Sequence, residues 1–208
     1  MKITSILLFV LILNFSVFSQ SKSNLKFSPL IAIGTIIKAT EIAKIQIGND
    51  LKGKNFFVKD WVDKTNTLRK ALFYKKGSIY KIYELPNHYD GNGQYGVFEL
   101  SDNAKFILYT TEYSYGSGDH SEGSSYFNII DLENLSSFSM KTLLTTETWE
   151  DGKQPVLSQC DSEISIKGNI VLVKTKKTKN RSYKEYFEEE CLSSGNYKIS
   201  DGKLIQIK

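Results

Sequence analysis

The clearest alternation of apolar and polar positions lies in the middle of the chain, between residues 94 and 144. Residues 95–100, 105–111, 125–132 and 138–144 each combine aromatic or β-branched residues with alternating polar ones, which is typical of β-strands. Turn-forming Ser, Asp, Asn and Glu residues separate the first two segments and the last two. The pattern predicts four consecutive strands of an antiparallel meander.

One part of this meander, residues 100–111, reads LSDNAKFILYTT. It resembles one blade of a TolB-type β-propeller, in which a Ser-x-Asp-Gly-Lys turn precedes an apolar strand. Asn103 and Ala104 stand where that turn has Asp and Gly. No second copy follows, although a propeller needs at least four blades of about 40 residues or more. The resemblance therefore covers a turn and a strand, and we do not extend it to a propeller fold.

Further strands are predicted on both sides of the meander, at residues 30–33, 41–47, 55–62, 68–74, 78–85, 163–166, 170–173, 196–199 and 204–207. Residues 36–45 also fit a short helix. Glycines at 77, 168 and 202 predict tight hairpin turns. We expect an all-β fold, an antiparallel β-sandwich or barrel-like meander of about a dozen short strands with little helix.

The N-terminal residues follow a different pattern. One positive charge, Lys2, precedes a short apolar run that ends in Val-Phe-Ser before Gln20. This layout is typical of a secretory signal peptide removed after Ser19, and the run is short for a membrane span of about 20 residues. We expect residues 1–19 to be a signal peptide and 20–208 a single β-rich exported domain, periplasmic or secreted in a bacterium, with no transmembrane span after cleavage. An uncleaved anchor is the alternative.

Charge is nearly balanced, with 27 basic and 23 acidic side chains. This balance argues against nucleic acid as a partner, because nucleic-acid binding usually requires a strongly basic face. Residues 174–184 are strongly basic, and residues 185–190 are strongly acidic. We interpret them as a solvated hairpin whose arms attract each other. A docking patch for an anionic cell-surface polymer is the alternative, and a protein partner is equally open.

Cys160 and Cys191 are the chain's two cysteines. Because both lie in the part expected to be exported, we predict a disulfide bond between them. It would close a loop of roughly 30 residues and stabilise the fold by about 3 kcal/mol. A catalytic thiol is the alternative, and it would need His88 or His120 nearby in the fold.

Residues 112–124 are predicted to form a surface loop, because they are rich in Gly and Ser. The candidate ligand-binding residues of this loop are Tyr113, Tyr115, Asp119, His120 and Glu122. Carboxylates and an imidazole on a loop between rigid strands could bind a metal ion, a sugar or a cationic group. A flexible hairpin connection without a ligand is the simpler interpretation, because Asp-His-Ser-Glu matches no specific metal-binding spacing.

A second candidate loop follows Pro86. Asp90, Asn92 and Gln94 are spaced like the first ligands of a calcium-binding loop, but Tyr95 replaces the glycine that such a loop requires. A looser calcium site at Asp90, or a zinc site at Asp119 and His120, is a hypothesis. No other cofactor is indicated.

Two classes of function fit these observations. The first is a non-enzymatic extracytoplasmic binding or structural module. The alternative is a metal-dependent hydrolase that uses Asp119, His120 and Glu122, with His88 and Asp90 as further candidates. The chain has no Gly-x-Ser-x-Gly and no His-Glu-x-x-His motif. We therefore favour the binding module and assign no catalytic residue.

Overall fold

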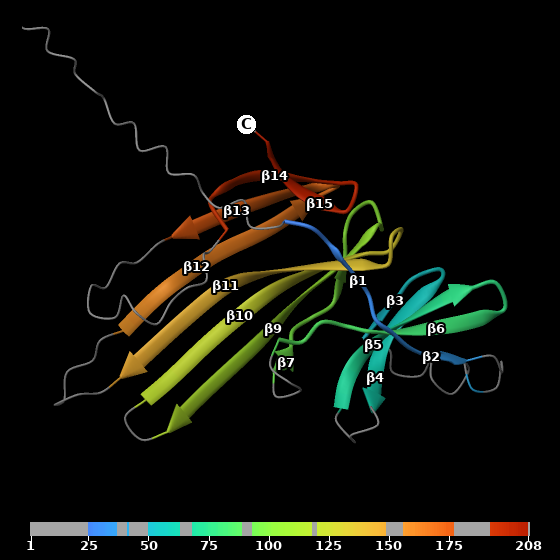
Figure 1. Ribbon diagram of the computed structural model, residues 1–208, viewed down its shortest axis with the longest axis horizontal. Coiled ribbons are helices and arrows are strands. Elements are labelled where there is room, and N and C mark those ends of the chain that lie inside the picture. Colours follow the sequence, from blue (N-terminus) through green and yellow to red (C-terminus); the bar gives the residue numbers. More distant parts are fainter. Residues whose placement is uncertain are drawn as a thin grey trace, which may run out of the picture.

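The computed structural model describes residues 25–36, 41, 50–62, 68–88, 93–117, 120–148, 156–176 and 192–207. Within these ranges the chain forms fifteen β-strands, which pair antiparallel in two sheets (Figure 1). The predicted all-β, antiparallel fold is confirmed, and neither sheet closes into a barrel in the described part of the chain.

The larger sheet is a meander whose main strands follow one another in sequence order. From one edge to the other it contains β15 (Lys203–Ile207), β14 (Gly195–Ser200), β13 (Ile170–Lys176), β12 (Val156–Lys167), β11 (Ser136–Thr148), β10 (His120–Asp131), β9 (Phe106–Ser117) and β7 (Gln94–Tyr95). Two further short strands lie outside this order: β8 (Glu99–Leu100) pairs with β9, and β1 (Ser28–Pro29) pairs with β11. Successive antiparallel strands need only short hairpin connections, which explains the simple order.

The smaller sheet is formed by the N-terminal part of the chain. Its order is β2 (Ala32–Ile36), β6 (Ile79–Glu84), β5 (Leu68–Lys76), β4 (Phe56–Val62) and β3 (Leu51–Lys52). The predicted hairpin between β5 and β6 turns at Gly77, whose φ of 65° is accessible to glycine without strain. Its strand boundaries therefore agree closely with the sequence pattern.

Alternating apolar residues give β9–β11 two buried faces. On one face, Ile107 and Ile130 pack against Val58, Leu72 and Leu85 in or next to the smaller sheet. We call this contact the sheet–sheet interface. On the other face, apolar side chains of β9–β11 pack with apolar side chains of β12–β15. We call that face the concave face, because its two groups of strands curl toward each other.

The curl begins where β11 and β12 separate. The two strands pair only between residues 143–147 and 156–161, with a register irregularity at Leu144 and Thr145. Beyond Asp161, β12 continues to pair with β13. The end of β12 contributes Ile164 and Ile166 to the same surface groove as Leu108 of β9, although β10 and β11 separate the two strands in the sheet. The sheet must therefore bend strongly.

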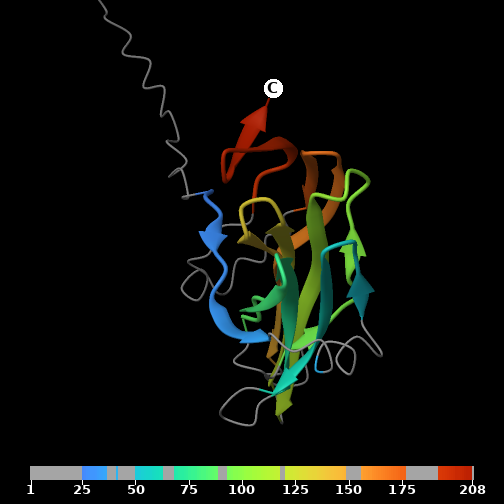
Figure 2. The same ribbon diagram turned by 90° about the vertical axis from the view of Figure 1, so that its right-hand side faces the viewer.

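Residues 25–30 link the last strand to the middle of the larger sheet. The Phe27 amide donates to the Gly202 carbonyl, and the Leu30 amide donates to the Leu135 carbonyl. The Phe27 ring also packs 5.5 Å from the Phe138 ring, centroid to centroid. Figure 2 shows this segment, in blue, along one side of the molecule below the red C-terminal strands. It covers part of one side of the concave face.

The structure corrects three boundaries. The predicted loop 112–124 is largely strand, since β9 extends to Ser117 and β10 begins at His120. The strand predicted to end at residue 144 continues to Thr148 as β11, and the predicted strand 95–100 is two short strands. The Gly- and Ser-rich residues 120–124 remain in the sheet because β10 pairs with β9 on one edge and with β11 on the other. The strand or helix predicted within residues 36–47 lies largely outside the described residues.

The turn that carries the TolB-like pattern is well defined. The Ser101 hydroxyl donates to Asn103 Oδ1 and accepts from the Phe106 amide. Ala104 has a φ of 56°, the left-handed conformation that glycine adopts most easily. The glycine expected at this position is therefore replaced by alanine without loss of the turn.

Candidate functional site

The β9–β10 hairpin contains the residues that the sequence singled out for ligand binding. Tyr113 pairs with Ser124 across the ladder, and Tyr115 pairs with Glu122. Tyr115 is 49% exposed, whereas Tyr113 is half-buried. Asp119 and the side chains of His120 and Glu122 lie outside the described part of the structure. The hairpin therefore places the two tyrosines on one face, two residues apart.

The two histidines occupy different parts of the molecule. The His88 ring stacks on the Tyr126 ring, with centroids 4.0 Å apart and an interplanar angle of 18°. Tyr126 lies six residues along β10 from His120, a distance of roughly 20 Å in an extended strand. Asp90, the candidate calcium ligand near His88, lies outside the described residues. The backbone thus separates the segment that carries His88 from the start of β10 at His120.

A polar cluster lies beside the His88–Tyr126 stack. The Asn128 amide group donates to Thr111 Oγ1 at 3.2 Å, and the Ser139 hydroxyl donates to Asn128 Oδ1 at 2.6 Å. Asn128 and Thr111 are fully buried. Lys141 Nζ lies 5.3 Å from the Tyr126 ring centroid, within the range of a cation–π contact. These contacts hold β9, β10 and β11 in register.

Two tyrosine hydroxyls anchor the segment that carries His88. Tyr109 donates to the Pro86 carbonyl at 3.0 Å, and Tyr95 donates to the Leu85 carbonyl at 3.4 Å. Burial, with a smaller contribution from Tyr95, raises the pKa of Tyr109 well above its ordinary value. Burial also raises the pKa of Tyr95. Both side chains therefore act as neutral hydrogen-bond donors at physiological pH.

A groove lies at the mouth of the concave face. Its volume is about 440 Å³. The lining residues are Val97, Glu99, Leu108, Tyr109, Thr110, Phe127, Ile164, Ser165 and Ile166. The size lies in the range of 300–1,000 Å³ typical of ligand sites. Val97 at its rim is 79% exposed. The groove is therefore open and mostly apolar.

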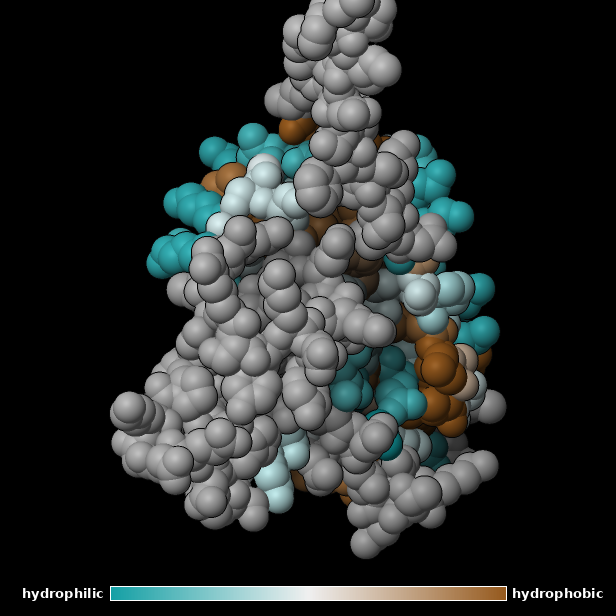
Figure 3. Space-filling model, turned by 60° about the vertical axis from the view of Figure 1, so that its left-hand side comes forward, coloured by the Kyte–Doolittle hydropathy of each residue, from teal (hydrophilic) through white to brown (hydrophobic). Residues whose placement is uncertain are grey.

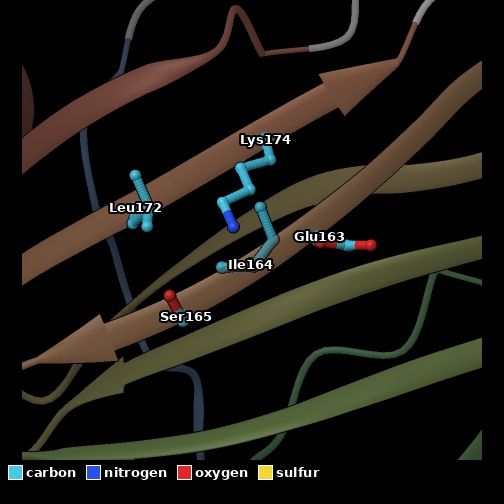
Figure 4. A pocket seen from close by; sticks show the side chains of 5 residues that line it. All are labelled: Glu163, Ile164, Ser165, Leu172 and Lys174. Carbon is cyan, nitrogen blue, oxygen red and sulfur yellow. The ribbon is translucent and has the colours of Figure 1, made fainter.

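A smaller hollow of about 240 Å³ lies between β12 and β13. Figure 4 shows its five lining residues on the two adjacent strands, with the Lys174 side chain extending from β13 toward β12. Ile164 and Ser165 line both hollows. This part of β12 is therefore accessible from more than one side.

Apolar side chains are also exposed on the surface outside the two hollows. Outside the grey atoms, Figure 3 shows a brown, apolar area on the right-hand side next to hydrophilic surface in teal, and smaller brown areas near the top. The exposed large apolar residues are Ile31, Val62, Leu68, Val97, Tyr115, Ile205 and Ile207. Val97 is the member of this set that also lines the groove.

The groove residues were not among the predicted site residues. Their strands could be predicted locally, but Val97, Leu108 and Ile164 meet only through the bend of the sheet. One signal was present: Ile107 and Leu108 are adjacent apolar residues in a strand, which indicates burial on both faces.

Two other predictions concern metal and sulfur chemistry. Within the described ranges, no three His, Cys, Asp or Glu side chains are grouped closely enough to hold a metal ion. The Cys160 side chain and all of Cys191 lie outside the described residues, so the predicted disulfide stays a prediction. No described helix is both long and apolar enough to cross a bilayer.

Comparison with known proteins gave no assignment: no protein-family model, curated protein or solved structure matches this chain.

Proposed function

We propose that this protein is an exported, non-enzymatic binding module that holds its partner in the groove at the mouth of the concave face. The observation that carries this proposal is the composition of the groove. Val97, Leu108, Phe127, Ile164 and Ile166 supply apolar contact area, and Glu99 is the one charged side chain in the described lining. Apolar walls with a few orienting polar groups are typical of binding sites.

The polar groups of the lining support binding more than catalysis. General acid–base chemistry requires a positioned group that can exchange protons near neutral pH. The Tyr109 hydroxyl is engaged with the Pro86 carbonyl, and burial raises the pKa of this tyrosine. Glu99 is exposed at the end of a two-residue strand. Glu99 is therefore suited to fixing the orientation of a partner, whereas Tyr109 is 2% exposed and its hydroxyl serves the sheet–sheet interface.

Export is supported by the pattern of the first 19 residues, a basic residue followed by a short apolar run and small or polar residues before Gln20. To test export, the full chain is expressed in a bacterium with its own leader, and the protein is purified from the extracytoplasmic fraction. Mass spectrometry of the N-terminal peptide should show a chain that begins at Gln20, as glutamine or as its cyclised pyroglutamate form. Recovery of uncleaved protein in the membrane fraction would instead favour the anchored form.

Binding is tested on the exported protein with Nile red, an uncharged apolar dye. We expect saturable fluorescence enhancement that Val97→Asp weakens about tenfold, since a charge at the groove rim opposes apolar contact. Leu68→Asp on β5 is the matched control, because Leu68 is 59% exposed and belongs to the other sheet. Equal effects of both substitutions would contradict a binding site in the groove.

The hydrolase alternative predicts a different outcome in the same preparation. A metal ion that binds only the folded protein must raise the melting temperature. A rise with Ca²⁺ or Zn²⁺ that disappears in Asp119→Ala or His120→Ala would favour a metal site in the hairpin. Our proposal predicts equal melting temperatures with Ca²⁺, Zn²⁺, Mg²⁺ and EDTA.

A further inference from the structure

The last third of β12 has an edge that faces away from β13. The two-residue turn at Gly168 and Asn169 makes Lys167 and Ile170 a hydrogen-bonded pair. Hydrogen-bonded and non-hydrogen-bonded pairs alternate in an antiparallel ladder. The backbone N–H and C=O groups of residues 162, 164 and 166 therefore point away from β13, toward the edge that β11 leaves at Asp161.

The outward backbone groups of Ile164 and Ile166 have no hydrogen-bond partner among the described residues, whereas the Ser162 amide still belongs to the ladder with β11. Pairing with β11 ends at Asp161, and the backbone bonds outside the ladders include none from Ile164 or Ile166. Both residues are half-buried. Ile164 lines both hollows described above, and Ile166 lines the groove. An accessible row of backbone donors and acceptors is the template on which β-strands pair.

The groove lies next to this edge and fits the side chains of an added strand. Ile164 and Ile166 direct their side chains to the concave face, whereas Glu163, Ser165 and Lys167 alternate with them and are exposed. A strand paired with this edge would continue that alternation. Its inward side chains would meet the apolar groove floor, and its outward side chains would lie beside polar residues.

The charge of the groove specifies the partner further. Glu99 is exposed and is the single charged residue in the described lining. Glu163, on the exposed face of β12 outside the groove lining, already faces Lys176 Nζ at 3.9 Å, so Glu99 supplies the charge that a partner meets in the groove. A cationic side chain next to an apolar one complements this arrangement.

We infer that the free edge of β12, at residues 164–166, binds an extended segment of another protein by β-strand addition. The bound segment alternates apolar residues, which enter the groove, with polar residues that include Lys or Arg. Its backbone pairs with Ile164 and Ile166, as in other domains that bind peptides at a sheet edge. This inference rests on the proposed function and names the partner class for the same groove.

The edge is short and flanked by charge, which explains how it can stay open in a folded protein. Natural sheets protect their edges with charged residues, short strands and bends. Glu163 and Lys167 flank the free segment, and the strand bends away from β11 just before it. These features oppose uncontrolled pairing while leaving room for a segment of about five to seven residues.

The test uses a panel of acetylated, amidated seven-residue peptides in which Val or Ile alternates with Lys or Thr. Binding to the exported protein is measured by calorimetry, and amide hydrogen exchange is followed by NMR. We expect peptide binding to slow exchange at the amides of Ile164 and Ile166. The amides of Ser165 and Lys167, which already point toward β13, should change little.

Backbone methylation of the peptide separates strand pairing from simple apolar contact. Methylating the amides that face β12 should weaken binding about tenfold or more, because each lost hydrogen bond leaves a protein carbonyl unpaired. Methylating the alternate amides, which face solvent, should leave affinity nearly unchanged. Glu99→Gln should weaken the Lys-containing peptides about two- to fivefold, with little effect on Nile red.

Other outcomes would overturn the inference. Equal affinity of both methylated series would show side-chain binding without strand pairing. Failure of every peptide, with Nile red binding still sensitive to Val97→Asp, would refute strand addition and retain the binding function. Failure of both probes would refute the inference and the proposed function together. Concentration-dependent dimerisation that protects Ile164 and Ile166 without peptide would show that a second copy occupies the edge.

Discussion

The sheet–sheet interface and the mouth of the concave face use side chains from the same strands, β9–β11, but they are closed to different degrees. At the sheet–sheet interface, Val58, Leu72, Leu85, Ile107 and Ile130 are all 0% exposed. The interior of the concave face is equally closed, with Ile129 and Val171 at 0% exposed, but Leu108 and Phe127 at its mouth line the open groove. The adjacent residues Ile107 and Leu108 of β9 therefore face a closed interface and an open groove, respectively.

This difference suggests a division of tasks between the two faces. A fully closed apolar interface contributes stability in proportion to the area it removes from water. An open apolar groove contributes less to stability, because its lining remains partly hydrated, and it is available to a partner. We infer that the sheet–sheet interface holds the fold together and that the mouth of the concave face carries the binding function.

Ile107 and Leu108 allow the sharpest test of this comparison. Ile107→Ala should lower the free energy of unfolding by about 2–5 kcal/mol, because it leaves a cavity in a closed interface. Leu108→Ala should cost less than half as much, since water already reaches the groove. Urea unfolding monitored by tryptophan fluorescence measures both values. Equal losses in the two variants would remove the distinction between the faces.

Asn128 tests whether the polar cluster beside the sheet–sheet interface is structural. Asn128→Ala should destabilise the fold by about 1–3 kcal/mol, because the buried Thr111 hydroxyl and the Ser139 hydroxyl lose their partner. Ser139→Ala is the matched variant, and a double-mutant cycle should give a coupling energy of about 1 kcal/mol. Additive effects would show that the two side chains do not act together.

Tyr109, in the sheet–sheet interface, should make the stability of the fold depend on pH in the alkaline range. Burial raises its pKa above the value in the unfolded chain, so folding favours the neutral hydroxyl. The resulting stability is fully present below about pH 10, the ordinary tyrosine pKa, and is lost as the pH rises toward the folded value. Tyr109→Phe should cost about 0.5–1.5 kcal/mol at pH 7 through the lost bond to Pro86.

The same variant should also flatten the alkaline loss of stability. Denaturant midpoints of the wild type should fall between pH 9 and 11, and those of Tyr109→Phe should fall by a smaller amount. Some loss should persist, because the pKa values of Tyr95 and Tyr197 are also raised by burial. Parallel curves for the two proteins would assign the alkaline loss to other groups.

Local sequence signals predicted the hairpins of this fold well. The turn at Asp201 and Gly202 has φ values of 52° and 65°, as an Asp-Gly hairpin turn requires. The turns at Gly77 and Gly168 were predicted for the same reason. Such turns depend on the backbone freedom of one or two residues, which can be read from the sequence without knowledge of the rest of the chain.

The groove and the length of the central strands could not be predicted in this way. Residues 112–117 and 120–124 are strands because β10 pairs with β9 and β11 along its length, although their Gly and Ser content favours a loop. The groove depends on the point where β11 and β12 separate, which joins Val97 to Ile164 over a long stretch of sequence. Long-range pairing decided both features.

Among these substitutions, a change at Val97 should have the smallest effect on stability. It should also separate most clearly the stabilising role of the sheet–sheet interface from the binding role of the groove. It is 79% exposed, so Val97→Asp should change the free energy of unfolding by less than about 0.5 kcal/mol. The same substitution should weaken Nile red and peptide binding about tenfold, because it places a charge at the rim of an apolar groove. Ile107→Ala should do the reverse at temperatures where it remains folded, lowering stability while retaining affinity. A Val97→Asp protein that lost stability and affinity in parallel would mean that the groove is part of the structural core.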